Sequence, residues 1–138
     1  MEFINDLLEA AKNVRKNAYA PYSGFHVGAA LLTENGDIYR GCNVENASLG
    51  LTTCAERTAV YSAIADGNRS FKAIAVISDL SRPVAPCGAC RQILFEFAPD
   101  IWVINANLEG SYKVFRLSDL LPEAFIFEKI NDKANNPG

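Results

Sequence analysis

Apolar side chains recur every three or four residues at the start of the chain, which predicts an amphipathic helix there. These positions are Phe3, Ile4, Leu7, Leu8, Ala11 and Val14. The helix is expected to end before Pro21. Residues 26–33 and 37–43 then have the composition of two strands, and Asn35-Gly36 between them is typical of a tight hairpin turn.

The middle of the chain predicts a loop followed by a second helix. Residues 44–52 lack any regular apolar period and are expected to form the loop. Thr52 or Thr53 is expected to cap a helix that runs to about residue 66, because threonine side chains accept hydrogen bonds from the first free amides of a helix. Gly67 is expected to end this helix.

The second half of the chain alternates strands and helices. Residues 72–78 are apolar except at their two ends, which is typical of a central strand buried on both faces. A helix is expected over residues 87–97, and strands over residues 101–104 and 112–117. A short helical turn at residues 118–121 follows.

These elements predict an α/β fold with a mixed five-stranded sheet and helices on both of its faces, which is a three-layer α/β/α arrangement. Only a short segment around Gly110 connects the fourth strand to the fifth. A parallel crossover needs a much longer connection, so these two strands are expected to pair antiparallel.

Composition narrows the class of protein. A chain of 138 residues predicts one domain, here placed at residues 1–130, and the polar residues 131–138 are expected to be a disordered tail. The net charge is −3 and no run of Lys and Arg is present, which disfavours nucleic acid as a partner. No signal peptide or membrane span is recognisable, so the cytoplasm is the expected location, where the four cysteines would stay reduced.

Three cysteines and one glutamate form the most informative chemical pattern. Cys54 and Glu56 begin one predicted helix, and Cys87 and Cys90 begin another with a spacing that turns both sulfurs to the same side. Helix N-termini favour thiolates over thiols. Three thiolates can bind a zinc ion and leave its fourth position open, whereas a structural zinc site is normally closed by four protein ligands. The pattern therefore predicts a catalytic zinc site with Glu56 as its acid–base group.

Two other uses of the cysteines stay open on spacing alone. A structural zinc site would need a fourth ligand, and the candidates are Cys42 and His26, which both lie in predicted strands. A redox pair formed by Cys87 and Cys90 would leave Cys54 and the glutamate without a role.

Arg57 lies directly after the glutamate. It can donate hydrogen bonds to the sulfurs and offset the negative charge of three thiolates on one zinc ion. The alternative is an ordinary arginine on a helix surface.

The residues of several segments, in this order, resemble the small homotetrameric cytidine deaminases over nearly the full length of the chain. The matching segments are Ala20-Pro21-Tyr22-Ser23-x-Phe25, Val27-Gly28-Ala29-Ala30-Leu31, Gly41-Cys42-Asn43-x-Glu45-Asn46-Ala47, Cys54-Ala55-Glu56-Arg57-Thr58-Ala59, Pro86-Cys87-Gly88-Ala89-Cys90-Arg91-Gln92 and Leu120-Leu121-Pro122-x-Ala124-Phe125. Cys-x-Glu followed by Pro-Cys-x-x-Cys is also the three-cysteine form of the zinc deaminase signature. The resemblance implies a cytidine deaminase-like fold.

The resemblance also implies the metal site. Cys54, Cys87 and Cys90 would bind one Zn²⁺ per subunit, and Arg57 would support their sulfurs. Glu56 would move protons between water, the substrate ring and the leaving ammonia.

For the substrate, the resemblance implies that Asn43 and Glu45 bind the ribose 3′-hydroxyl and that Phe25 flanks the cytosine ring. The carbonyl and N–H of Ala55 would contact the edge of the base, and Phe125 would reach into the pocket of a neighbouring subunit. From the residues alone, Asn43 and Glu45 are also compatible with polar turn residues. Phe25 and Phe125 are also compatible with core residues.

The reaction that the resemblance implies is the hydrolysis of cytidine or 2′-deoxycytidine to uridine or 2′-deoxyuridine and ammonia, in pyrimidine salvage. Glu45 at the 3′-hydroxyl would repel a 3′-phosphate, which argues against a polynucleotide. The alternatives are a deaminase of a related nucleoside such as blasticidin S, a nucleic-acid deaminase or binder, and a non-catalytic zinc module. One departure is Leu49, where family members often carry a tyrosine, so an aromatic contact between subunits is expected to be missing.

Overall fold

A mixed five-stranded sheet forms the centre of the protein, and the computed structural model describes residues 1–128. The predicted tail at 131–138 lies outside these residues. The strand order is β2-β1-β3-β4-β5. The strands are β1 Val27–Thr33, β2 Ile38–Cys42, β3 Phe71–Ser78, β4 Trp102–Ala106 and β5 Tyr112–Arg116. The central position of β3 agrees with the apolar run over residues 73–77.

The strand directions make the sheet mixed. β1 pairs antiparallel with both β2 and β3, and β3 pairs parallel with β4. β4 and β5 pair antiparallel, with Ile104 opposite Val114. The short connection around Gly110 had predicted this last pairing, because a turn of that length cannot carry the chain back to the other end of the sheet.

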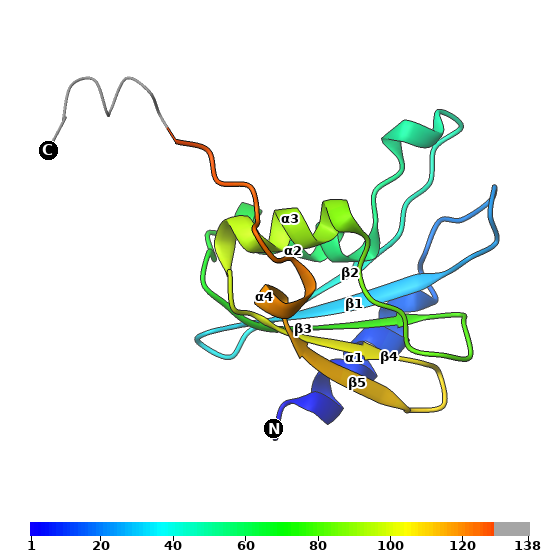
Figure 1. Cartoon of the computed structure of the whole chain (residues 1–138). Coiled ribbons are helices and arrows are strands. Elements are labelled where there is room, and N and C mark those ends of the chain that lie inside the picture. The colour runs from blue at the N-terminus through cyan, green and yellow to red at the C-terminus, as the bar shows by residue number, and fades with distance from the viewer. Residues whose placement is uncertain (129–138) are drawn as a thin grey trace, which may run out of the picture.

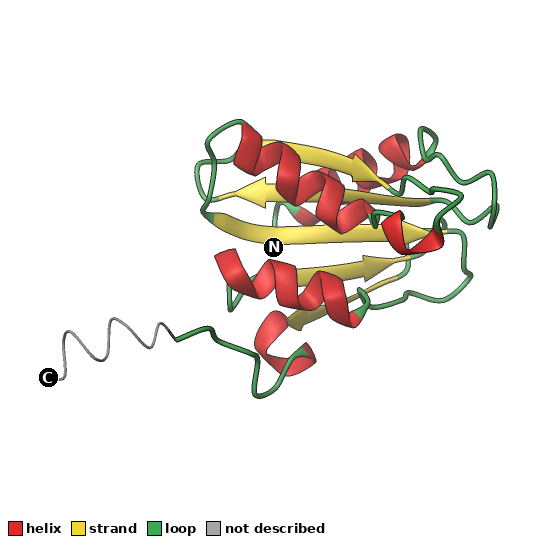
Figure 2. Ribbon diagram, turned by 90° about the horizontal axis from the view of Figure 1, so that it is seen from above, coloured by secondary structure: helices red, strands yellow, loops and turns green. Residues whose placement is uncertain are grey.

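Helices cover both faces of the sheet, so the predicted three-layer arrangement is confirmed. α1 (Ile4–Arg15) lies on one face, and α2 (Ala55–Ala65) and α3 (Gly88–Phe97) lie on the other. Figure 2 shows α2 and α3 side by side over the sheet. The short α4 (Leu117–Leu120) follows β5 directly. Within residues 1–128, no helix is both long enough and apolar enough to cross a membrane.

Each strand in the middle of the sheet contributes to two hydrophobic cores, because alternate side chains point to opposite faces. In β1, Ala29 and Leu31 face the α2–α3 side, whereas Ala30 and Leu32 face α1. Burial on both faces explains why this strand reads as a continuous apolar run.

Two glycines let helices lie unusually close to the sheet. A Cβ on Gly28 would lie 2.0 Å from the carbonyl oxygen of Ala11 in α1, and a Cβ on Gly41 would lie 2.3 Å from the carbonyl oxygen of Ala55 in α2. Both distances are much shorter than a van der Waals contact, so a side chain at either position would clash with the helix backbone. Gly41 therefore sets how closely the first turn of α2, which begins next to Cys54, lies against β2.

The start of α2 differs from the prediction. Its N-cap residue is Cys54, and no side chain caps the helix. Thr53 instead pairs with Val44 in an isolated β-bridge, and the hydroxyl of Thr52 accepts the N–H of Asn46. The predicted threonine cap is wrong because both threonines are used to hold the preceding loop. That loop also contains a 3-10 turn, η1 (Leu49–Leu51), which the sequence pattern did not predict.

Candidate active site

A cavity of about 370 Å³ lies between the carboxyl end of β3 and the N-terminus of α2. Ligands commonly bind at this edge of open α/β sheets. The cavity is lined by Ser23, Phe25, Val27, Asn43, Glu45, Thr52, Cys54, Ala55, Glu56, Val76, Ser78, Val84, Ala85 and Cys87. The fold thus gathers most of the site residues that the sequence predicted, although they come from four separate segments.

Three sulfur atoms converge beside this cavity. Cys54 and Cys87 are the N-cap residues of α2 and α3, and Cys90 is buried in the first turn of α3. The three sulfurs lie within 4.8 Å of one another, and those of Cys54 and Cys87 are 4.0 Å apart. Tetrahedral zinc with Zn–S bonds of about 2.3 Å places its sulfur ligands about 3.8 Å apart. The sulfurs therefore fit a zinc ion with only small adjustment.

A fourth protein ligand is missing from the described part of the chain. Neither Cys42 nor His26 belongs to the group of potential ligands that residues 1–128 bring together, and Glu56 does not join it either. His26 contacts Asp79 instead, with 3.3 Å between Nδ1 and Oδ2. Cys54 completes a three-sulfur group, which a redox pair of Cys87 and Cys90 would not need. The geometry thus favours an open metal site over a closed structural one.

Arg57 makes the contact expected of it. Its Nη2 lies 3.3 Å from the sulfur of Cys54. A hydrogen bond from Cys90 lowers the pKa of the Cys54 thiol to about 5, with burial opposing and Arg57 assisting. The same hydrogen bond, together with burial, raises the pKa of Cys90. Cys54 therefore ionises before Cys90, and a bound metal ion would favour the thiolate form of its sulfur ligands.

Glu56 is a buried carboxyl group at the cavity wall. Glu56 is 5% exposed and lies in the first turn of α2, two positions after Cys54. Burial raises the pKa of Glu56 to about 6, and the neighbouring charge of Cys54 acts in the same direction. A buried carboxyl group beside an open metal position is well placed to exchange protons with a ligand there.

Asn43 and Glu45 also line the cavity, and they hold the loop that precedes β1. The side-chain oxygen of Asn43 accepts the N–H of Val27, and its nitrogen donates to the carbonyl oxygen of Phe25, both at 2.8 Å. Glu45 Oε1 accepts the N–H groups of Tyr22 and Ser23 at 3.0 and 3.1 Å. These residues are therefore more than polar turn residues, because they fix the backbone that carries Phe25.

Phe25 and Ala55 also line the cavity. The N–H of Ala55 lies at the first position of α2, where no intrahelical acceptor exists, so it is free for a ligand. The carbonyl oxygen of Ala55 lies 2.3 Å from the place of a Cβ on Gly41 of β2, so it faces this strand. The expected contact of this carbonyl with a base stays a prediction.

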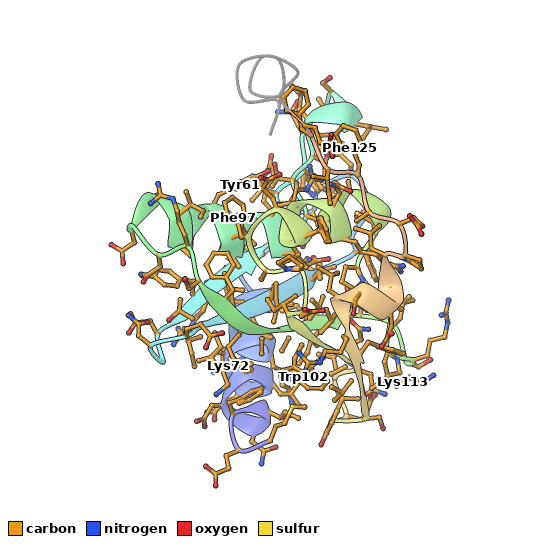
Figure 3. The ribbon with its side chains drawn as sticks, turned by 60° about the vertical axis from the view of Figure 1, so that its left-hand side comes forward. Tyr61, Lys72, Phe97, Trp102, Lys113 and Phe125 are labelled. Carbon is orange, nitrogen blue, oxygen red and sulfur yellow. The ribbon has the colours of Figure 1, made fainter. Side chains whose placement is uncertain are left out.

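Phe125 does not line this cavity. It is 69% exposed, and its carbonyl oxygen accepts a hydrogen bond from Gln92 of α3 at 3.0 Å. Figure 3 shows Phe125 beyond the helices that cover the sheet, whereas Lys72 and Trp102 lie on the side of α1. The expectation that Phe125 is a core residue of its own subunit is excluded.

The structure adds cavity residues that sequence reasoning missed. Val84 and Ala85 come from the loop before α3, and Ser78 ends β3. Ser23 stands within a segment that matched the family, yet no role followed from its sequence context. Its place in the cavity lining and its hydrogen bond to Glu45 show that it belongs to the site, and both depend on the tertiary structure.

A second hollow of about 410 Å³ lies near the other end of the sheet, between Phe71, Asp100 and Trp102. Its lining contains no cysteine or histidine, and the guanidinium of Arg116 stacks on Trp102 with 3.8 Å between Cζ and the ring centroid. This hollow therefore lacks the sulfur ligands that line the first cavity.

Known proteins match both the sequence and the fold. Residues 1–106 match the family described as cytidine and deoxycytidylate deaminase zinc-binding region. A cytidine deaminase from Halalkalibacterium halodurans is 52% identical over 127 residues, which are 91% of this chain and 96% of that protein. A blasticidin-S deaminase from Bacillus cereus is 33% identical over 105 residues, which are 70% and 74% of the two chains. The crystal structure of cytidine deaminase from Burkholderia pseudomallei superposes with a TM-score of 0.86 and 54% identity, covering 88% of this chain and 98% of that one.

Proposed function

The chain belongs to the zinc-binding cytidine and deoxycytidylate deaminase family, and from this membership we propose that it hydrolyses free cytidine and 2′-deoxycytidine to uridine and 2′-deoxyuridine with release of ammonia. The observation that carries the proposal is the position of the buried Glu56 carboxyl beside three convergent sulfurs at the wall of one cavity. A single domain over residues 1–130 would perform this reaction in the cytoplasm as part of pyrimidine salvage.

Cys54, Cys87 and Cys90 would hold one Zn²⁺ per subunit. When bound, zinc would supply a Lewis acid that makes water a nucleophile near neutral pH. Arg57 would offset the charge of the three thiolates, since it already donates to the sulfur of Cys54.

Glu56 would carry the protons of the reaction. It takes one proton from the attacking water and delivers it to N3 of the cytosine ring as the C4–O bond forms. It then passes the remaining hydroxyl proton to the amino group, so that the C4–N bond breaks and ammonia leaves. The product keeps the N3 proton and gains the C4 carbonyl, which balances the hydrolysis.

The other residues of the cavity would bind and orient the nucleoside. Phe25 would flank the base, and the free N–H of Ala55 would donate to its carbonyl oxygen. Asn43 and Glu45 would bind the 3′-hydroxyl of the sugar, because both reach the cavity wall from the end of β2. The negative charge of Glu45 would disfavour a 3′-phosphate and hence a polynucleotide.

The family resemblance further leads us to propose a homotetramer with active sites at its subunit interfaces. Large apolar side chains that would be costly to expose support this assembly. Leu49 and Leu51 of η1 are 72% and 68% exposed on a segment that projects from the body of the subunit, and Phe125 is similarly exposed. Sedimentation of the purified protein at several concentrations would test the tetramer.

The proposed activity is tested by the loss of cytidine absorbance in the ultraviolet, measured beside the zinc content of the same preparation. We expect turnover with about one zinc ion per subunit. The relative from Bacillus cereus makes blasticidin S the matched alternative substrate. Faster turnover of blasticidin S than of cytidine would reject the proposed substrate, and zinc binding with neither activity would reject the enzyme.

A further inference from the structure

The loop before β1 is held largely by side-chain oxygens, several of them from elsewhere in the fold. Each backbone N–H from residue 22 to residue 27 donates a hydrogen bond, and most of the acceptors are side-chain oxygens. Glu45, Asn43 and Asp79 provide three of these acceptors. The position of this cavity wall therefore depends on a few polar groups rather than on a β-ladder.

Ser23 is the one residue of this loop whose hydroxyl links two of the proposed substrate-binding residues. Its hydroxyl donates to Glu45 Oε2 and accepts the N–H of Phe25 at 3.0 Å. Among the groups that lower the pKa of Glu45, the Ser23 hydroxyl has the largest effect. The side chain also lines the cavity.

The hydrogen bonds of Glu45 leave a defined vacancy for a ligand. A carboxylate has about four acceptor positions. The N–H groups of Tyr22 and Ser23 occupy the two on Oε1, and the Ser23 hydroxyl occupies one on Oε2. One acceptor position on Oε2 remains. Asn43 donates one of its two amide N–H groups to Phe25, which leaves one donor on a side chain that lines the same cavity as Glu45. One donor and one acceptor match a hydroxyl group, which can engage both.

The direction of the remaining acceptor depends on how the carboxylate is turned. The terminal torsion of a glutamate has only a broad preference of its own. Two amides anchor Oε1, but the carboxylate plane can still rotate about that anchor. The Ser23 hydroxyl is the second anchor, so it sets the direction in which Oε2 faces a ligand.

We propose that Ser23 is a positioning residue for sugar recognition, whose hydroxyl turns the Glu45 carboxylate toward the 3′-hydroxyl of the nucleoside. This inference rests on the proposed function. It assigns to Ser23 a contribution that is specific to the 3′-hydroxyl. Phe25 stays in place without it, because its carbonyl oxygen remains bonded to Asn43 and the next two amides remain bonded to Asp79 and Asn43.

The test compares Ser23→Ala with the wild type on cytidine and on 3′-deoxycytidine, using zinc-loaded protein. We expect KM for cytidine to rise about tenfold with kcat within about threefold, because one hydrogen bond to a charged group is lost. For 3′-deoxycytidine, KM and kcat of Ser23→Ala should stay within about threefold of the wild-type values. That substrate has no 3′-hydroxyl that could donate a hydrogen bond to Glu45. Ser23→Thr keeps the hydroxyl and should restore most of the cytidine KM.

Ser111→Ala is the matched control, because Ser111 is exposed in the turn between β4 and β5, away from the cavity. It should leave both substrates unchanged. An equal rise in KM for the two substrates in Ser23→Ala would show a general loosening of the loop and overturn the proposal, and so would an unchanged cytidine KM. Wild-type protein that turns over neither substrate would instead reject the proposed function itself, and with it the role of Ser23.

Discussion

The two halves of the cavity are built in different ways. In the metal half, Cys54 and Glu56 stand at the start of α2, and Cys87 and Cys90 at the start of α3, so helix geometry fixes the positions within each pair. In the half proposed to bind the sugar, called the sugar half below, Ser23, Phe25, Asn43 and Glu45 come from a loop and a strand end and hold one another by hydrogen bonds.

This difference predicts a division of labour. A group that moves protons must keep its place relative to the metal, and rigid helix ends provide that constraint. Recognition of a sugar needs several donors and acceptors in one place, and loops can supply them from distant parts of the chain. Changes in the metal half should therefore act mainly on kcat, and changes in the sugar half mainly on KM.

The largest expected effect comes from Glu56→Gln. Glutamine has nearly the same shape but cannot accept and return the proton, so kcat should fall about a thousandfold or more. Zinc content and the circular dichroism spectrum should match the wild type, because Glu56 is not among the grouped metal ligands. A kcat within tenfold of the wild type would remove Glu56 from the chemistry and break the proposed division.

The next largest effect is expected for Glu45→Gln in the sugar half. The amide of glutamine would place an N–H donor against the N–H groups of Tyr22 and Ser23 or the Ser23 hydroxyl, which already donate there. We therefore expect kcat/KM for cytidine to fall about a hundredfold, mostly because KM rises. Steady-state kinetics measures this split. Glu109→Gln, in the exposed turn before β5, is the control and should change neither constant. A loss confined to kcat would contradict the assignment of Glu45 to binding.

A pair of glycine substitutions separates the metal half from the rest of the fold. Gly28→Ala and Gly41→Ala each force a Cβ into a helix backbone and should lower the free energy of unfolding by about 1–3 kcal/mol. Only Gly41→Ala displaces α2, which carries Cys54 and Glu56, so only this variant should also lower kcat and bind zinc more weakly. Urea unfolding and competition with a zinc chelator measure the two effects. Equal zinc affinity in both variants would show that the close approach at Gly41 does not position the metal half.

The smallest expected effect concerns pH. The Ser23 hydroxyl and the two amides hold the pKa of Glu45 below its ordinary value. Because its pKa is lowered, the Glu45 carboxylate keeps its negative charge as the pH falls through the ordinary pKa of a glutamate. It is protonated only when the pH falls through the lowered pKa. The ratio of the dissociation constants of 3′-deoxyuridine and uridine should therefore change less than about twofold from pH 7 to pH 5. In Ser23→Ala the ratio should begin to fall at a higher pH, as titration calorimetry would show. An identical pH profile in the two proteins would contradict the coupling of Ser23 to Glu45.

The element types and the sheet were largely predictable from the sequence. Continuous apolar runs identified β3 as central, and the short connection around Gly110 predicted the direction of β5. The cap of α2 was not predictable, because Thr52 and Thr53 satisfy every local rule for a cap but hydrogen-bond within the preceding loop. The capping preference of threonine was therefore outweighed by the contacts of Thr52 with Asn46 and of Thr53 with Val44.

The sequence by itself determined each pair of the metal half, because Cys-x-Glu and Cys-x-x-Cys are short spacings that helix geometry converts into positions, whereas the packing of α2 and α3 brings the two pairs together. It also determined the family, since the matching segments extend over most of the chain. Only the tertiary structure decided how Ser23, Asn43 and Glu45 share their hydrogen bonds and which acceptor is left for a ligand. The physical reason is that these bonds join residues about twenty positions apart, and their geometry depends on how β1, β2 and the loop before them pack.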